Sequence, residues 1–264
     1  MSTTDAPRQW TEWRELRHAT VSAPHGPLAL TATHWLADRP GGRLPDVPGR
    51  WAEALSGDAV LLTAAPEDGL RLDGEPFAGE VRLTADGSPA AARTVHGARR
   101  LVVLRREGRW AVRVFDPAAP ARREFAGVDA FAYDGRWTRP GRYRPYERAR
   151  TVLVGNADGR ERGLSLAGEL SFELAGEVRV LRVGEETDGA LWAVFADATS
   201  GVSSYRFRFL RTPAPDAAGR VEVDLNRAVL PPCAFADHFI CPFPPPGNVL
   251  LVAVEAGERA VLTR

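Results

Sequence analysis

Apolar and polar residues alternate along most of the chain, in short segments separated by glycine, proline and aspartate. Residues 80–87 show the pattern clearly, because Val81 and Leu83 alternate with Arg82 and Thr84. Alternation with a period of two is typical of a β-strand that has one buried face. About a dozen segments of this kind predict a mainly β fold, either an antiparallel β-barrel or a β-sandwich.

The predicted strands follow one another with turn signals between them. One long segment has the pattern of a hairpin that turns at Glu107-Gly108, between two apolar stretches. The predicted strands are residues 28–36, 58–65, 80–87, the two arms of 100–116, 148–155, 169–174, 177–184, 190–197, 204–211, 221–226 and 248–256.

Three segments carry further predictions. In residues 204–211 the three aromatic residues share one face of a strand, while Arg206 and Arg208 share the other. Residues 248–256 are apolar on both faces, which predicts a central, buried strand. Residues 117–145 are rich in arginine, glycine, proline and aromatic residues, and we expect this block to be irregular.

One helix is predicted, over residues 8–21, where Trp10, Trp13 and Leu16 fall three apart. We expect this apolar stripe to pack the helix on a sheet rather than to bind a ligand. No stretch alternates strands with helical patterns, which disfavours an α/β fold.

The composition is that of an ordinary soluble globular protein. The chain has 264 residues, of which 44% are hydrophobic and 26% charged, with a net charge of zero. This balance gives no electrostatic footprint for nucleic acid or an anionic membrane, so we expect neither as a partner. We predict a single β-rich domain over residues 1–264, with a division near residue 147 as the weaker alternative.

Several chemistries are excluded by residues that the sequence lacks. The chain has no lysine, so it has neither a Schiff-base lysine nor a phosphate-binding P-loop lysine. It also lacks the glycine-rich nucleotide motif, the zinc-protease motif and the serine-hydrolase elbow. We therefore expect no cofactor. No apolar run reaches the roughly 18 residues of a membrane span, and no secretory signal is present, so a cytoplasmic location is expected.

The candidate site is residues 221–258, which hold both cysteines and 6 of the 21 prolines. Asp224 and Asn226 project from the same polar strand face, and Arg227 follows at its exit. The nearby prolines stiffen the loop and would hold these polar groups in place. We predict that Asp224 transfers protons and that Asn226 and Arg227 bind a carboxylate or carbonyl of the substrate.

Cys233, His238 and Cys241 leave several interpretations open. The plainest is a pair of buried thiols, and a disulfide that closes the loop is a second. A zinc site is a weak alternative, because the C-x4-H-x2-C spacing lacks the compact C-x2-C pair. A nucleophilic Cys233 with His238 or His34 as its base is the last.

Four residues outside this cluster complete the predicted site. His34 lies on a mostly apolar strand and is a candidate for proton transfer, with Trp35 beside it as a substrate contact. Tyr205 ends a polar loop and is a second candidate substrate contact. Glu255 shares a face with the apolar odd-numbered residues of 249–253, so we predict a partly buried catalytic carboxylate that has Arg227 as its partner.

The motifs of this stretch resemble a known family. D-L-N-R-A at 224–228, P-P-C-A-F at 231–235, C-P-F-P-P-P-x-N at 241–248 and E-A-G-E at 255–258 are similar to the domain of unknown function 1684 family. Segments at 24–26, 33–36, 113–116, 125–127 and 195–199 fit it too, so that the likeness extends over nearly the whole chain. The resemblance implies a fold and a site region, not a reaction.

The chain departs from the family pattern at four positions. The family tends to have an aromatic residue and an asparagine where Val229 and Leu230 stand, a glycine where Phe207 stands, and a lysine where Arg259 stands. The apolar replacements predict a pocket for a more hydrophobic ligand.

The predicted function is a cofactor-independent enzyme that acts on a small organic metabolite in a β-barrel or β-sandwich pocket. A non-catalytic small-molecule binding protein is the first alternative, and a metal-binding module at the two cysteines and His238 is the second. Actinobacterial specialised metabolism is a natural setting for a lysine-free chain of this kind.

Overall fold

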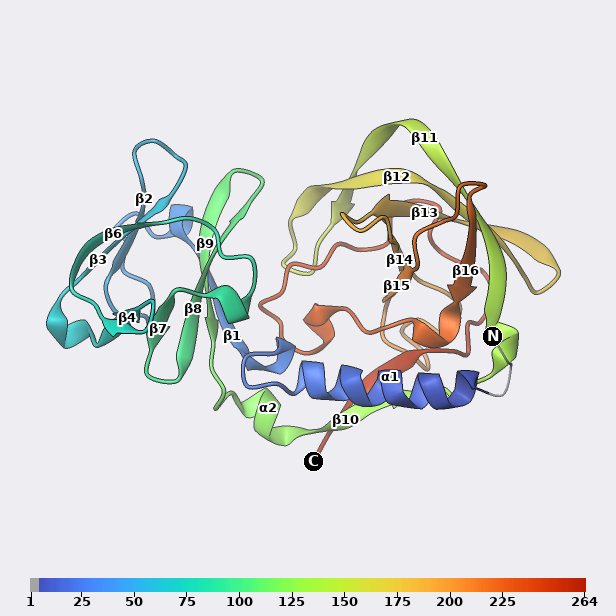
Figure 1. Cartoon of the computed structure of the whole chain (residues 1–264), viewed down its shortest axis with the longest axis horizontal. Coiled ribbons are helices and arrows are strands. Elements are labelled where there is room, and N and C mark those ends of the chain that lie inside the picture. The colour runs from blue at the N-terminus through green and yellow to red at the C-terminus, as the bar shows by residue number, and fades with distance from the viewer. Residues whose placement is uncertain (1–4) are drawn as a thin grey trace. The chain divides into compact units, whose positions relative to one another are not determined.

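The computed structural model describes residues 5–264, and they form two compact units. The larger unit contains residues 5–18 and 125–264, and the smaller contains residues 19–124. Strands dominate both units, and they pair antiparallel within the sheets (Figure 1). The predicted mainly β fold with an N-terminal helix is therefore confirmed. The prediction of a single domain concerns whether both units unfold together, which the structure does not measure, so it stays a prediction.

The smaller unit is built from two antiparallel sheets. One has the strand order β1-β9-β8-β7-β4-β5, and the other has the order β2-β3-β6. Its strands are β1 (Leu30–Trp35), β2 (Arg50–Glu53), β3 (Val60–Ala64), β4 (Leu70–Leu72), β5 (Glu75–Pro76), β6 (Gly79–Leu83), β7 (Thr94–His96), β8 (Arg99–Arg106) and β9 (Arg109–Phe115), and the short helix α2 (Pro120–Glu124) ends it.

The larger unit is organised around one sheet of six strands with the order β15-β14-β13-β12-β11-β16. Its other strands are a separate pair, β10 with β17. The strands are β10 (Phe125–Ala130), β11 (Thr138–Gly155), β12 (Glu161–Leu174), β13 (Glu177–Glu185), β14 (Leu191–Phe195), β15 (Arg208–Thr212), β16 (Arg220–Asp224) and β17 (Glu258–Thr263).

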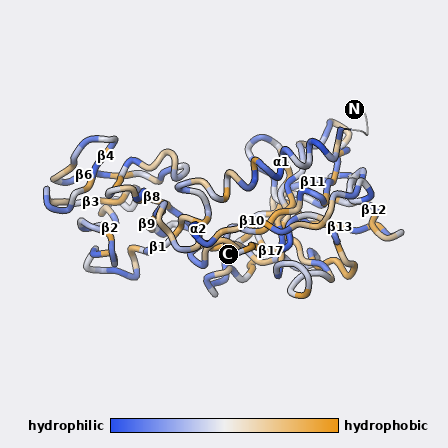
Figure 2. Tube along the Cα trace, turned by 90° about the horizontal axis from the view of Figure 1, so that it is seen from below, coloured by the Kyte–Doolittle hydropathy of each residue, from blue (hydrophilic) through white to orange (hydrophobic). Residues whose placement is uncertain are grey.

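The alternation that predicted strands also explains the core of the larger unit. Along β12 the even-numbered residues point inward, and Leu170 and Phe172 are almost fully buried. They join Leu181, Leu191 and Phe195 in one hydrophobic cluster. Figure 2 shows hydrophobic and hydrophilic stretches that alternate over short distances along the trace. Among residues 5–264, no helix is long and apolar enough to cross a membrane.

The helix α1 (Ala6–Val21) begins two residues before the predicted range. It is tied to the larger unit by polar contacts: the Trp10 indole donates to the carbonyl of Asn226 at 3.1 Å, and Arg14 donates to the carbonyl of Val128 at 2.8 Å. The predicted apolar stripe is only partly used, because Leu16 is 69% exposed.

Three strand predictions were wrong. The block 117–145 is not irregular, since it contains β10 and the beginning of β11. Of the predicted aromatic strand 204–211, only residues 208–211 lie in a strand, and Arg208 is fully buried while Arg206, predicted on the same face, is exposed. Residues 248–256 form no strand; they run beside 196–198 through isolated hydrogen bonds, with alternate residues buried and exposed.

Candidate functional site

The polar cluster predicted at the end of β16 exists, and a tight turn builds it. Residues Leu225–Arg227 form one turn of 3-10 helix that Asp224 caps. One carboxylate oxygen of Asp224 accepts hydrogen bonds from the backbone N–H of Asn226 at 3.1 Å and from its side-chain amide at 2.9 Å. It also accepts from the Thr138 hydroxyl at 3.2 Å. The sequence order D-L-N-R thus fixes this carboxylate locally.

Asn226 has a structural part in this cluster. Its side chain is buried, and its amide nitrogen donates to the carbonyl of Asp134 at 3.0 Å. Its amide oxygen accepts from the Asp134 N–H at 3.2 Å. These contacts join the turn to the segment before β11. Because protein groups use both ends of the amide, the side chain positions the turn and leaves little capacity for a ligand.

Arg227 is held at one nitrogen only. Its Nε donates to the second carboxylate oxygen of Asp224 at 3.2 Å, and its guanidinium lies 5.7 Å from the centre of the Trp13 ring. The side chain is 38% exposed. Within the described part of the chain, residues 5–264, the two terminal Nη groups of Arg227 have no hydrogen-bond acceptor. Arg227 therefore offers an unused pair of parallel donors.

A cleft of about 800 Å³ in the larger unit lies beside this turn. One part of its lining is aromatic, since the rings of Trp192 and Phe209 meet edge to face with centres 5.1 Å apart. The full lining is Trp13, Arg17, Glu186, Trp192, Phe209, Arg211, Thr212, Pro213, Glu222, Asp224, Arg227 and Val229.

The charged side chains that line the cleft differ in how many hydrogen bonds and ion pairs they form with other protein groups. Arg211 forms ion pairs with Glu186 and Asp188. The Glu222 carboxylate is exposed and accepts no hydrogen bond from any residue in the range that the structure covers. Arg227 and Glu222 are consequently the charged lining groups with the most open hydrogen-bonding capacity.

A buried carboxylate that the sequence analysis missed supports one edge of the cleft. Arg17 donates to Glu258 at 2.9 Å and to the carbonyl of Leu230 at 3.0 Å. Glu258 also accepts from the Leu230 N–H at 2.6 Å. Gly257 precedes this carboxylate with a φ of +78°, and a Cβ there would lie 2.5 Å from the carbonyl oxygen of Ala228. Only glycine fits this turn, which places Glu258 under the helix.

Glu255 is not the partly buried carboxylate that was predicted, because its side chain is exposed. The residues that share its face are exposed too, with Val249 at 57% and Leu251 at 84%. The prediction chose the wrong face of the segment, and Arg227 pairs with Asp224 instead.

Three other predicted site residues do not line the cleft. Tyr205 donates through its hydroxyl to the carbonyl of Cys233 at 3.3 Å. His34 and Trp35 lie on β1 of the smaller unit, where the guanidinium of Arg109 lies 5.0 Å from the centre of the Trp35 ring. The cleft is formed by the larger unit alone, and a contribution from these two residues stays a prediction.

Cys233 and Cys241 are buried thiols, which matches the plainest of the four interpretations. Among residues 5–264, no group of three or more histidine, cysteine, aspartate or glutamate side chains could hold a metal ion. His238 therefore does not join the two cysteines as the third ligand of a zinc site.

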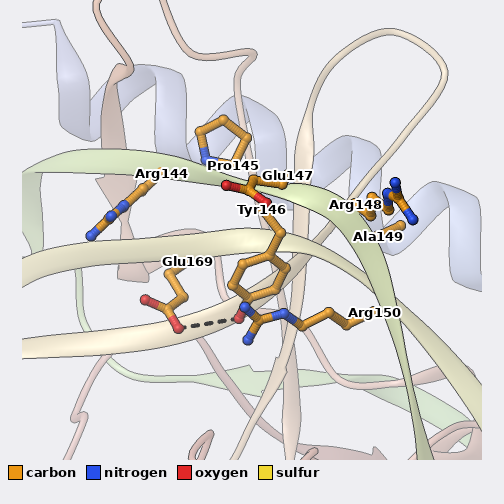
Figure 3. Close-up of a pocket in the computed structure, with 8 residues that line it drawn as sticks. All are labelled: Arg144, Pro145, Tyr146, Glu147, Arg148, Ala149, Arg150 and Glu169. Atoms are coloured by element: carbon orange, nitrogen blue, oxygen red, sulfur yellow. Dashed lines mark hydrogen bonds between the residues drawn. The ribbon is translucent and has the colours of Figure 1, made fainter.

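A second hollow, of about 760 Å³, follows the bulge of β11 opposite β12. Figure 3 shows the Arg150 guanidinium against the Tyr146 ring, 3.9 Å from its centre, and the Tyr146 hydroxyl bonded to Glu169. The guanidiniums of Arg144 and Arg148 point to opposite sides of the view (Figure 3). Since these cations do not converge, the cleft beside Arg227 is the better candidate site.

The larger unit is thus an antiparallel β domain with a cleft of aromatic and charged side chains beside a capped turn. The chain belongs to the family described as protein of unknown function (DUF1684), whose model matches residues 123–259, slightly more than half of the chain. The match covers most of the larger unit, and the resembling segments at 24–36 and 113–116 lie outside it.

One solved structure gives a further comparison. The chain is similar to the solution NMR structure of the uncharacterized protein from gene locus rrnAC0354 of Haloarcula marismortui, with 33% sequence identity, 51% of this chain and 77% of that chain covered, and a TM-score of 0.43. No curated protein matches the chain.

Proposed function

We propose that the larger unit binds a small organic carboxylate that carries an aromatic or other apolar group, in the cleft beside Arg227. The observation that carries the proposal is the state of Arg227. Its Nε is fixed by Asp224 while both Nη groups remain without a protein acceptor in residues 5–264. A guanidinium held in this way presents two parallel donors, the arrangement that receives a carboxylate in bidentate form.

The aromatic lining supports an apolar group on the same ligand. Trp192 and Phe209 supply flat apolar surface, and Val229 adds an aliphatic contact. Val229 is one of the positions where the chain departs from the family pattern, and its place in the lining supports the expected preference for a hydrophobic ligand. Glu222 offers an acceptor to a hydroxyl or amino group at the other end of such a molecule.

Turnover of the bound acid would make the domain the cofactor-independent enzyme that the sequence suggested, acting in the cytoplasm and in specialised metabolism. The cleft contributes Asp224 to that hypothesis but not Glu255. Mass spectrometry of each ligand after incubation with the protein tests turnover separately from binding.

The experiment is calorimetric titration of the full chain with four probes: indole-3-acetate, phenylacetate, the uncharged phenylacetamide and the small polar acid malonate. We expect the aromatic acids to bind at least about tenfold more tightly than the amide, because the amide lacks a charge-assisted pair that contributes about 1.5–3 kcal/mol. We expect a similar preference over malonate, because malonate lacks the apolar group whose burial contributes about 1.5–3 kcal/mol. Malonate bound one to one, with no binding of the aromatic acids, would contradict the proposal.

Arg227→Gln removes the two parallel guanidinium donors and is expected to weaken binding of the aromatic acids by about tenfold or more. Arg220→Gln is the matched control, because Arg220 also donates through Nε to an aspartate, at 2.8 Å, and lies on β16, the strand before the Arg227 turn, but outside the cleft. Equal affinities of the two variants, with unchanged circular dichroism, would refute the part given to Arg227.

A further inference from the structure

Cys233 and Cys241 form a close pair in the larger unit. The backbone N–H of Cys233 donates to the sulfur of Cys241 at 3.3 Å, and both side chains are buried. Cys233 lies in the 3-10 turn Pro232–Ala234, and the carbonyl of Cys241 accepts from the N–H of Ala157 at 2.9 Å. Proline stiffens the backbone next to both residues, so the two thiols are held near each other.

Polar groups surround the Cys233 sulfur, although the wider cluster is aromatic. The Tyr205 hydroxyl lies 3.8 Å from this sulfur. The Arg206 guanidinium lies 4.8 Å from the centre of the Phe243 ring and 5.5 Å from that of Phe207, which keeps a cation on this side of the cluster. An apolar core that merely buried a thiol would not need a phenol and a guanidinium beside it.

These neighbours favour the thiolate. The hydrogen bond from the Cys241 thiol, followed by those from Tyr205 and Arg206, lowers the pKa of Cys233 to about 7, against the opposing effect of burial. Burial, with the nearby Cys233 sulfur, raises the pKa of Tyr205 to about 12, so that its hydroxyl keeps the proton that it can share with a thiolate.

A hollow of about 630 Å³ lies next to the pair and is lined in part by Tyr205, Arg206 and Ala234, the residue after Cys233. It gives a small reagent a place beside the backbone of the Cys233 turn. Arg206 is exposed there, so it can meet the reagent before the buried sulfur does.

We infer that Cys233 is a reactive thiol which is oxidised by a small hydroperoxide, and that Cys241 then resolves it into a reversible disulfide. This modification site is separate from the ligand cleft, and the inference does not depend on the proposed function.

The two steps balance. The Cys233 thiolate attacks the terminal oxygen of the hydroperoxide, the O–O bond breaks, and the alkoxide or hydroxide that leaves takes up a proton, which gives Cys233 sulfenic acid and an alcohol or water. The Cys241 sulfur then attacks the sulfenic sulfur, water leaves, and the S–S bond forms. The peroxide is reduced by two electrons, which the two thiols supply.

The test treats the reduced full chain with an equimolar amount of hydrogen peroxide and follows intact mass and peptide mass. We expect the wild type to lose two hydrogen atoms, with one disulfide that links the peptides of Cys233 and Cys241. The Cys241→Ser variant is expected to stop at one added oxygen on Cys233, which a dimedone trap captures. The Cys233→Ser variant is expected to react at least about tenfold more slowly.

Arg206→Gln separates a tuned thiol from a merely buried one, because Arg206 is exposed and we expect its replacement to leave the circular dichroism spectrum unchanged. We expect the pH midpoint of iodoacetamide labelling at Cys233, followed on its own peptide in the reduced wild type, to lie near 7 and to rise by a measurable amount in Arg206→Gln. Labelling with an ordinary midpoint before that change would overturn the inference. So would oxidation of Cys233→Ser as fast as wild type, or a wild type that keeps both thiols while its methionine is oxidised.

Discussion

Replacing Asp197 by asparagine should destabilise the larger unit strongly, because this carboxylate neutralises a cation with no access to solvent. The side chains of Asp197 and Arg208 are both 0% exposed and lie 2.6 Å apart. Asp197 also accepts from the Thr199 N–H at 2.8 Å, the Thr199 hydroxyl at 2.7 Å and the Val254 N–H at 3.1 Å. Arg208 donates in addition to the carbonyls of Val254 and Ala256.

The expected loss of stability in Asp197→Asn follows from the contacts that an asparagine amide cannot make. Asparagine keeps an oxygen for the three donors, but its NH₂ group would face the buried guanidinium of Arg208. Breaking a buried ion pair by removing one charge costs about 3–5 kcal/mol. Burial already lowers the pKa of Arg208, with Asp197 opposing that effect, so the loss of Asp197 leaves the cation with no opposite charge to offset its burial.

Urea unfolding of the full chain, followed by circular dichroism, measures the effect. Asp216→Asn is the control, because Asp216 pairs with Arg220 in an exposed position, and its cost is expected to be small beside that of Asp197→Asn. In the double variant Asp197→Asn with Arg208→Met, we expect a cost at least about 1 kcal/mol smaller than the sum of the single costs. A cost of Asp197→Asn below about 1 kcal/mol, or additive single costs, would refute this reasoning.

Three further predictions concern other parts of the larger unit. Glu258→Gln should lower the melting temperature by several degrees, roughly the effect of 1–2 kcal/mol, whereas Glu255→Gln at an exposed position should leave it unchanged in a thermal scan. Gly257→Ala should cost more than Gly176→Ala in urea unfolding, since both have positive φ but only Gly257 has backbone atoms in the way of a Cβ. The pKa of Cys233 is lowered from 9.0 to about 7. The Cys233 thiolate therefore contributes to stability fully above pH 9, and this contribution is lost as the pH falls through 7. The free energy of unfolding, measured between pH 7 and 9, should rise with pH more in wild type than in Cys233→Ser.

Features that depend on a few neighbouring residues could be predicted from the sequence. The hairpin of β8 and β9 is one, because its turn needs positive φ at both central residues. Glu107 and Gly108 have φ values of 50° and 77°. Glycine adopts this conformation freely, and the alternation on either side fixes the register of the arms. The Asp224-Asn226-Arg227 turn is another, since its capping contacts span only four residues.

Features that depend on distant segments could not be predicted in the same way. Alternation correctly separates Arg208 from Phe209, but it does not say that Asp197 and two carbonyls would satisfy an arginine inside the core. The same ambiguity led to Glu255 in place of Glu258, because both faces of residues 248–256 look apolar. The aromatic lining of the cleft comes from Trp13, Trp192 and Phe209, on separate elements that only the fold brings together.

The residues that mark the family resemblance divide into two groups by their hydrogen bonds. The side chains of Asn226 and Glu258 form their hydrogen bonds within the protein. The Asn248 side chain does the same, with hydrogen bonds to the backbone of Arg182 and Val194. Of the polar side chains in D-L-N-R-A, Arg227 alone keeps donors for a ligand in the described chain. Under the proposed function, the motif would specify a supporting structure and one anchoring group, while the lining residues outside it would set the shape of the ligand. A relative with the same motif and a different lining is expected to hold a carboxylate at the same arginine and to select a different apolar group.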